Sequence, residues 1–128
     1  YHLVFVTKYR RKVLRAGMCA FCAGTIKRVC THYPDIQLLE VNTDEDHIHL
    51  LASIPPKMSV SKAVNLLKSN SARAMRLKFP FLETVYDRHI GFWSDGYFVS
   101  TVGINEEQIR RYIEHQGEED SAGTRIEM

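Results

Sequence analysis

The sequence lacks any apolar run that approaches the ~20 residues that a membrane-spanning helix needs. Its first residues also lack the basic, apolar and small-residue succession of a secretory signal segment. We therefore expect a cytoplasmic protein that has no membrane partner. The sequence contains no internal repeat, linker or low-complexity segment, and its 128 residues suit a single domain.

Cysteine is scarce and odd in number, since only Cys19, Cys22 and Cys30 are present. The Cys19-x-x-Cys22 spacing occurs in redox and metal sites, but no second cysteine pair follows it. Cysteine in an intracellular protein behaves as a small apolar residue. We therefore predict that these cysteines fill space in the core of the protein.

Acidic residues are missing from two long stretches, although the net charge is only +2. Residues 1–34 contain seven lysines and arginines and residues 47–82 contain six, and neither stretch contains an acid. This segregation predicts a basic surface that binds a polyanion. The alternative is that two solvated helix faces carry a biased charge without binding anything.

The pattern of apolar residues predicts the element order β-α-β-β-α-β-α. Strands are expected at residues 2–7, 36–41, 47–54 and 97–102, and helices at about 14–33, 59–79 and from 105 onward. This order is that of an α+β, ferredoxin-like (RRM-like) fold, with helices on one face of an antiparallel sheet and an added C-terminal helix. Residues 1–117 form the predicted domain, and residues 118–128 are predicted to be a flexible tail.

The helix expected at residues 59–79 has two different faces. An apolar stripe at 3-to-4 spacing points inward, and it consists of Val60, Val64, Leu67, Ser71 and Met75. The opposite face is basic and hydrogen-bonding, and it consists of Lys62, Asn65, Ser69, Arg73 and Arg76. A helix that contacts phosphates has such a face, although a plain solvated face looks similar.

Two histidines, His47 and His49, alternate in a predicted strand. Alternate side chains of a strand share a face at a spacing of about 6.6 Å, so the two imidazoles can converge on one cation. A His-x-His pair alone is a weak signal, because many strands carry such pairs without a metal. Asp46, which precedes them, can orient an imidazole or form the turn.

A second signal, Tyr112-Ile113-Glu114-His115-Gln116, lies near the other end of the chain. Residues four apart in a helix share a face, so Tyr112 and Gln116 point the same way. Two imidazoles with the Gln116 carbonyl oxygen form a ligand set that suits magnesium or manganese as well as zinc. With a phenol as nucleophile, this set can cleave phosphodiesters. The simpler interpretation of Tyr112 is a half-buried aromatic residue.

Several other histidine-based chemistries do not fit the sequence. Zinc deaminases need His-x-Glu followed by a cysteine pair, and here the only cysteine pair precedes the histidines. Zincins need His-Glu-x-x-His on a helix, which is absent. Histidine-triad hydrolases need a third alternating histidine where this chain has Leu51.

Six segments together match one family pattern. They are residues 1–14, 46–51 with the two prolines at 55–56, 59–62, 67–69, 92–98 and 112–116. With these segments the chain resembles, almost end to end, the single-tyrosine HUH transposases of bacterial and archaeal insertion sequences. In that name U is the hydrophobic residue between two histidines, which is Ile48 here.

The resemblance implies a mechanism. His47, His49 and Gln116 would hold magnesium or manganese, unless a water fills the third position and Gln116 lies behind it. Tyr112 would attack a phosphate of single-stranded DNA, which gives a 5′-phosphotyrosine and a free 3′-hydroxyl. A positive charge near the phenol would favour its phenolate.

The resemblance also implies partners. Members of the family are homodimers that recognise DNA hairpins near the ends of the element, and the tyrosine helix often completes the site of the other subunit. Whether it acts in cis or in trans here is left open. The protein would act at the nucleoid. The residues expected to contact DNA are Lys8, Arg10, Arg11, Lys62, Arg73 and Arg76.

Two alternatives accompany this interpretation. A domesticated relative would act on repetitive palindromes instead of mobilising its own element. A non-enzymatic nucleic-acid-binding module of the same fold would stack bases on exposed aromatic residues of the sheet. The predicted central strand carries histidines at those positions, which favours the enzyme.

Overall fold

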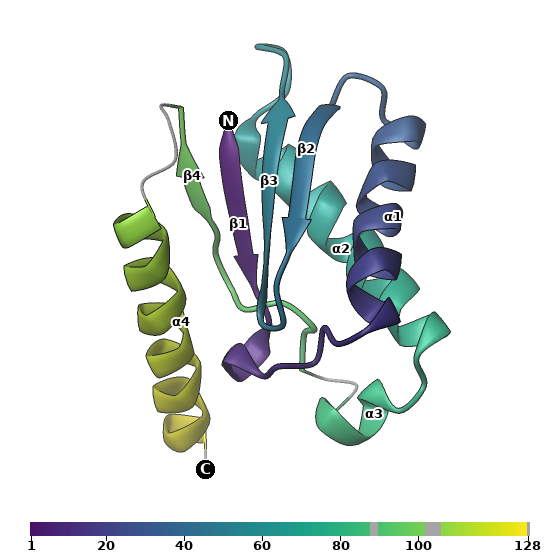
Figure 1. Ribbon diagram of the computed structural model, residues 1–128. Coiled ribbons are helices and arrows are strands. Elements are labelled where there is room, and N and C mark those ends of the chain that lie inside the picture. The colour runs from purple at the N-terminus through teal and green to yellow at the C-terminus, as the bar shows by residue number, and fades with distance from the viewer. Residues whose placement is uncertain (88–89, 102–105, 128) are drawn as a thin grey trace.

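The structure, a computed structural model, describes residues 1–87, 90–101 and 106–127 (Figure 1). Four strands form one antiparallel sheet in the order β2-β3-β1-β4. They are β1 His2–Val6, β2 Gln37–Thr43, β3 His47–Ser53 and β4 Phe98–Ser100. The predicted fold class is therefore confirmed.

Helices cover both faces of this sheet. The helices α1 Gly17–His32 and α2 Val60–Lys78 lie on one face, and α4 Glu106–Glu127 lies along β1 and β4 on the other (Figure 1). A short 3-10 helix, η1 Lys8–Arg10, follows β1, and α3 Leu82–Val85 follows α2. No helix in the described ranges is both long and apolar enough for a membrane span.

The position of β1 in the middle of the structure explains why its sequence is continuously apolar. Leu3 and Phe5 pack toward α1 and α2, whereas Val4 and Val6 pack toward α4. All four side chains are at most 1% exposed. A strand that is buried on both faces shows no polar alternation, so this run anchors two separate apolar layers.

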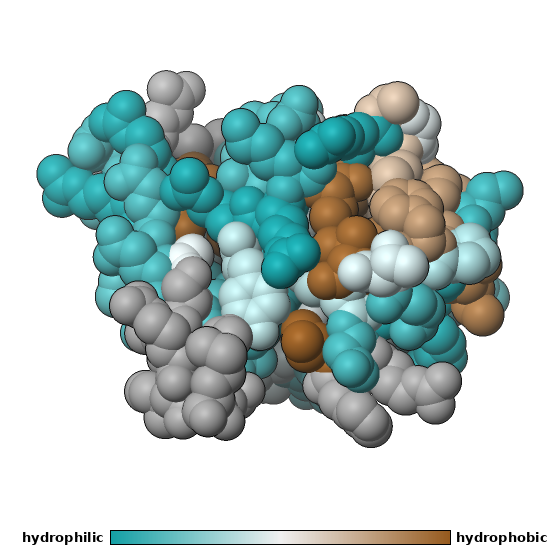
Figure 2. Space-filling view, turned by 90° about the horizontal axis from the view of Figure 1, so that it is seen from below, coloured by the Kyte–Doolittle hydropathy of each residue, from teal (hydrophilic) through white to brown (hydrophobic). Residues whose placement is uncertain are grey.

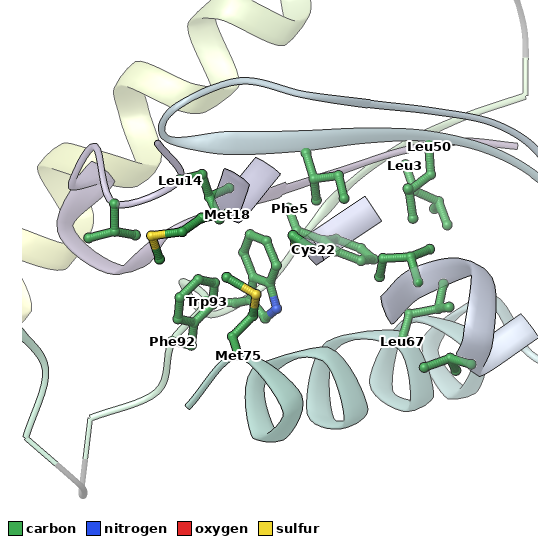
Figure 3. Packing of buried hydrophobic residues seen from close by; sticks show 14 of the residues in the cluster. Leu3, Phe5, Leu14, Met18, Cys22, Leu50, Leu67, Met75, Phe92 and Trp93 are labelled. Atoms are coloured by element: carbon green, nitrogen blue, oxygen red, sulfur yellow. The ribbon is translucent and has the colours of Figure 1, made fainter. Parts of the chain in front are cut away.

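The larger core lies between the sheet and the α1–α2 pair (Figure 3). Trp93 enters it and donates a hydrogen bond from Nε1 to the Ser71 hydroxyl at 3.0 Å, which explains a serine in the inward stripe of α2. Cys22 is fully buried in the same core, and burial, followed by the charge of Cys19, raises the pKa of its thiol to about 12. The cysteine therefore serves as apolar filling, as predicted.

The element ends differ from the sequence prediction in a few places. Ser59 is the N-cap of α2, and its hydroxyl accepts the Lys62 amide at 3.0 Å, as expected. The first helix begins at Gly17 instead of residue 14. The cap expected at Asn105 lies outside the described residues. Helix α4 does not end at Gly117 but continues to Glu127, while the domain limit at 117 and the flexibility of 118–128 stay predictions.

Candidate active site

His47 and His49 lie on the sheet face that α4 covers. His49 pairs with Val4 and His47 pairs with Val6, so both imidazoles share a face with the valines that pack against α4. They border an open pocket of about 430 Å³ between the sheet, the loop before β3 and α4. Its lining consists of Arg10, Asp46, His47, His49, Ile109, Arg110, Ile113 and Glu114.

The Asp46 carboxylate orients the His47 ring. The Asp46 Oδ1 and His47 Nδ1 atoms are 2.8 Å apart, and the Arg10 Nε atom lies 3.5 Å from Asp46 Oδ2. The hydrogen bond from His47, above all, lowers the pKa of Asp46. When Nδ1 donates to Asp46, the lone pair of His47 resides on Nε2, which is then free to bind a cation.

His49 presents an unsatisfied nitrogen. Its Nε2 atom is buried and finds no hydrogen-bond partner among the described residues. Burial, followed by the charge of His2, lowers the pKa of His49, so the ring is neutral at pH 7. A neutral imidazole is the form that ligates metals. The chemistry of this donor pair therefore fits a divalent cation.

His2 is a neighbour that the sequence argument missed. Its ring centroid lies 5.7 Å from that of His49, because His2 pairs with Leu51 and so stands diagonally across from His49. Its Nδ1 atom is also buried, with no partner in the part of the chain that the structure describes. Only the register of β1 against β3 could have revealed it. Even so, no three His, Cys, Asp or Glu side chains among the described residues are placed to hold a metal.

Tyr112 and Gln116 share a face of α4, as predicted. Both reach the turn at Gly96, where an added Cβ would lie 3.9 Å from the Tyr112 hydroxyl and 4.0 Å from Gln116 Oε1. The Tyr112 ring packs beside Phe98 of β4 at a centroid distance of 5.9 Å. The phenol oxygen and the amide oxygen therefore both lie near Gly96.

The structure does not bring this pair to the histidines of the same chain. Phe98 pairs with Val4, and Val4 pairs with His49, so the strand beneath Tyr112 lies two strand spacings, about 10 Å, from β3. Ile109 and Ile113 of α4 fill the space between them. The single chain thus holds two halves of the predicted site, on opposite sides of the α4 helix.

The environment of the phenol favours its protonated form. Burial, followed by the charges of Asp120 and Glu119, raises the pKa of Tyr112 to about 12. The hydroxyl is buried and has no hydrogen-bond partner among the described residues. The charges that act on the Tyr112 hydroxyl in this arrangement are therefore negative, whereas a positive charge would favour the phenolate.

The predicted DNA-contacting residues near β1 are already engaged within the chain. Lys8 Nζ lies 3.6 Å from the Asp120 carboxylate and 3.9 Å from that of Asp95. The Arg11 guanidinium lies over the rings of Tyr9 and Tyr86, at 5.6 and 5.8 Å from their centroids. Arg10, described above, lines the histidine pocket. Of these residues, Arg10 is therefore the one that lies at that pocket, and the expected DNA contacts stay predictions.

The predicted DNA-contacting residues on α2 lie in the helical layer, which is the layer that α1 and α2 form. This layer covers the face of the sheet opposite to the histidines. Lys62 and Arg73 are exposed there. Arg76 instead donates to the backbone carbonyls of Tyr86, Asp87 and Ile90 and pairs with Glu83 at 3.3 Å. The guanidinium of Arg76 therefore ties α2 to the backbone of these three residues, and its expected DNA contact stays a prediction.

A second, larger pocket lies in the helical layer. Apolar side chains gather on the underside of the molecule, toward the side of α1 and α3, next to hydrophilic ones (Figure 2). The pocket there has a volume of about 820 Å³, and three of its lining residues, Lys12, Arg15 and Lys78, are basic. The other lining residues are Val13, Ala16, Gly17, Met18, Phe21, Phe79, Phe81 and Val85.

Known proteins similar to this chain identify its family. The family model described as "Transposase IS200 like" matches residues 1–116. The transposase for insertion sequence element IS200 of Salmonella typhimurium is 41% identical over 128 residues, which are 100% of this chain and 83% of that protein. The ISDra2 transposase TnpA of Deinococcus radiodurans is 33% identical over 122 residues, 94% of this chain and 85% of the relative.

The fold agrees with this similarity. A crystal structure of a transposase from Deinococcus radiodurans superposes with a TM-score of 0.81 at 31% identity, over 90% of this chain and 88% of that one. Sequence and fold thus point to the same class of DNA-binding, DNA-cleaving enzymes. The chain belongs to the IS200-like transposase family.

Proposed function

We propose that this transposase cleaves and rejoins single-stranded DNA at the ends of an insertion sequence through a 5′-phosphotyrosine on Tyr112. The observation that carries the proposal is the buried, unpartnered Nε2 of His49, which lies beside a pocket under the helix that bears Tyr112 and Gln116. The unpartnered nitrogen of a neutral imidazole supports a cation site at this pocket.

The proposed cation is magnesium or manganese, held by His47, His49 and Gln116. When bound, it would polarise the scissile phosphate and so make the phosphorus more electrophilic. Asp46 keeps the His47 ring in the orientation and tautomer that bind. The low pKa of His49 keeps that ring neutral and ready to bind at physiological pH.

In the proposed reaction the Tyr112 oxygen forms a bond to phosphorus as the bond to the 3′ oxygen breaks. The phenol loses its proton, and the departing 3′ oxygen gains one and becomes a hydroxyl. One phosphodiester is exchanged for another, so the reverse reaction with a different 3′-hydroxyl rejoins strands without ATP. Because burial and acids raise the pKa of Tyr112, the phenol must leave its present surroundings to react.

We propose that the working unit is a homodimer in which α4 of one copy completes the site of the other. Tyr112 and Gln116 lie on the β4 side of α4, whereas the histidines lie on its β3 side. The short strand β4 is at the edge of the sheet, and Val99 on it is 40% exposed. A second copy beside this edge could receive the pair. The tyrosine helix would then act in trans.

We also propose that the DNA includes a hairpin and that the helical layer contributes to its binding. Arg73 and Lys62 are exposed on α2. The pocket of the helical layer combines a basic rim with aromatic residues, and the Lys78 Nζ atom lies 5.8 Å from the centroid of the Phe21 ring. Cations and aromatic faces together suit a phosphate backbone with unpaired bases.

The proposal is tested by incubating the protein with hairpin-bearing single-stranded oligonucleotides and magnesium. We expect a covalent protein–DNA species on a denaturing gel, formed on the DNA fragment downstream of the cut. Tyr112→Phe is the matched control, because it removes one oxygen and keeps the ring that packs beside Phe98. It should bind the hairpin and form no adduct. Binding without any adduct from the unaltered chain would favour the non-enzymatic alternative.

Arg73→Ala should weaken hairpin binding and reduce the slope of log K against log salt by about 1, because one phosphate contact is lost. The slope is measured by titrating labelled hairpin at several salt concentrations. Arg111→Ala is the control, since Arg111 is an exposed arginine that pairs with Glu107 on α4. Equal slopes for Arg73→Ala and the unaltered protein would exclude a DNA contact at Arg73.

A further inference from the structure

A buried carboxylate lies one helical turn beyond the predicted amide ligand. Gln116 and Asp120 are each only 6% exposed. The amide Nε2 of Gln116 donates to Asp120 Oδ1 at 3.4 Å. The carbonyl Oε1 of Gln116 is the atom that lies near Gly96, 4.0 Å from where a Cβ on that residue would stand. The two ends of the carboxamide thus face chemically different neighbours.

Donors surround Asp120. The Tyr9 backbone amide donates to Oδ2 at 2.8 Å, the Ser94 hydroxyl donates to the same oxygen, and the Lys8 ammonium lies 3.6 Å from Oδ1. An ionised carboxylate can only accept hydrogen bonds. A Gln116 amide turned by half a rotation would place its oxygen against this carboxylate and would lose the hydrogen bond.

We propose that Asp120 is a positioning residue that fixes the Gln116 carboxamide so that its oxygen, and not its amino group, is offered to the cation. The inference rests on the proposed ligand role of Gln116. Only the carbonyl oxygen of a carboxamide is a useful ligand for magnesium or manganese. Residues that orient ligands in this way typically account for about 10- to 100-fold in metal affinity.

This contact differs in one respect from the contacts of Asp120 with Tyr9, Ser94 and Lys8. Gln116 and Asp120 are four residues apart on the same helix, so their hydrogen bond moves with α4 wherever that helix docks. The contacts to Tyr9, Ser94 and Lys8 join α4 to other segments and would break if the helix moved. The orientation of the amide is therefore kept in either a cis or a trans arrangement.

The test measures manganese binding by the loss of the free-ion EPR signal, with uncut hairpin DNA and in a Tyr112→Phe background that prevents turnover. We expect Asp120→Asn to weaken manganese binding at least about 10-fold, because an asparagine can both donate and accept and no longer selects one amide orientation. The charge-matched control is Glu119→Gln, an exposed acid on the same turn that pairs with His115, and it should bind as before.

Three further variants separate orientation from helix docking. Ser94→Ala removes a partner from another segment and keeps the Gln116–Asp120 contact, so it should leave manganese affinity unchanged. Gln116→Glu places two carboxylates side by side and should weaken manganese binding. Adding Asp120→Asn to this variant should recover the manganese affinity, since the asparagine amide can donate to the introduced carboxylate. A purely structural role for Asp120 would give no such recovery.

The outcomes distinguish this inference from the proposed function. If Gln116→Ala leaves manganese binding unchanged, both the ligand assignment and this inference are overturned. If Gln116→Ala weakens binding but Asp120→Asn does not, the positioning role alone is overturned. An effect of Ser94→Ala as large as that of Asp120→Asn would also overturn it, because docking of α4 would then explain both.

Discussion

His49→Ala should reduce DNA cleavage by about 10³-fold or more, and added manganese should not restore it. The Nε2 atom of His49 is buried and unpartnered among the described residues, and the ring is neutral, so this side chain is the better prepared of the two proposed imidazole ligands. Alanine removes the donor and leaves a space that water can fill, but water cannot replace an oriented imidazole. The measurement is the initial rate of cleavage of a hairpin oligonucleotide across a range of magnesium and manganese concentrations.

The control for this prediction is His115→Ala. His115 lies within the motif that carries Tyr112, but its side chain is 65% exposed and pairs with Glu119 on the same helix. We expect cleavage within a factor of about two of the unaltered protein, because exposed ion pairs contribute little. Manganese rescue of His49→Ala to near the original rate would mean that the histidine acts outside the cation site.

Local periodicity predicted each half of the candidate site. The period of a strand placed His47 and His49 on one face, and the period of a helix placed Tyr112 and Gln116 together. Both predictions need only neighbours along the chain. The Ser59 cap of α2 was predictable for the same reason.

The relation between the two halves could not be predicted, because it depends on how α4 packs on the sheet. Ile109 and Ile113 dock onto Val4 and Val6, residues from the other end of the chain, and this docking decides which side of α4 faces the histidines. Helical spacing shows which residues of α4 share a face with Tyr112. It does not show which strand of the sheet that face contacts.

Long-range partners also changed the interpretation of several cations. Arg76 looked like a residue for phosphate contact because α2 has a basic outer face, yet its guanidinium binds backbone carbonyls after α3. Lys8 looked equally free in its basic turn and instead lies beside Asp120 of α4. A charge pattern in the sequence shows which cations exist, and only the fold shows which are already paired.

Mixed dimers of Tyr112→Phe and His49→Ala should recover cleavage although each variant alone is inactive. If the tyrosine helix acts in trans, half of the dimers in an equal mixture are mixed, and each has one complete site, so about one quarter of the original sites are active. If it acts in cis, every site lacks either the phenol or the imidazole and activity stays absent. The two chains are co-expressed with different tags, and the adduct is measured on a denaturing gel.

With a reciprocal mixture, the choice between cis and trans no longer depends on the exact fraction of mixed dimers. When the unaltered chain is paired with a chain that carries both substitutions, a purified mixed dimer has no complete site in trans but one complete site in cis. Activity in the first mixed dimer and none in the second would establish exchange of α4 between copies. The opposite result would place Tyr112 with the histidines of its own chain, and α4 would then have to turn about its axis to carry the phenol past Ile109 and Ile113, which now separate it from His49.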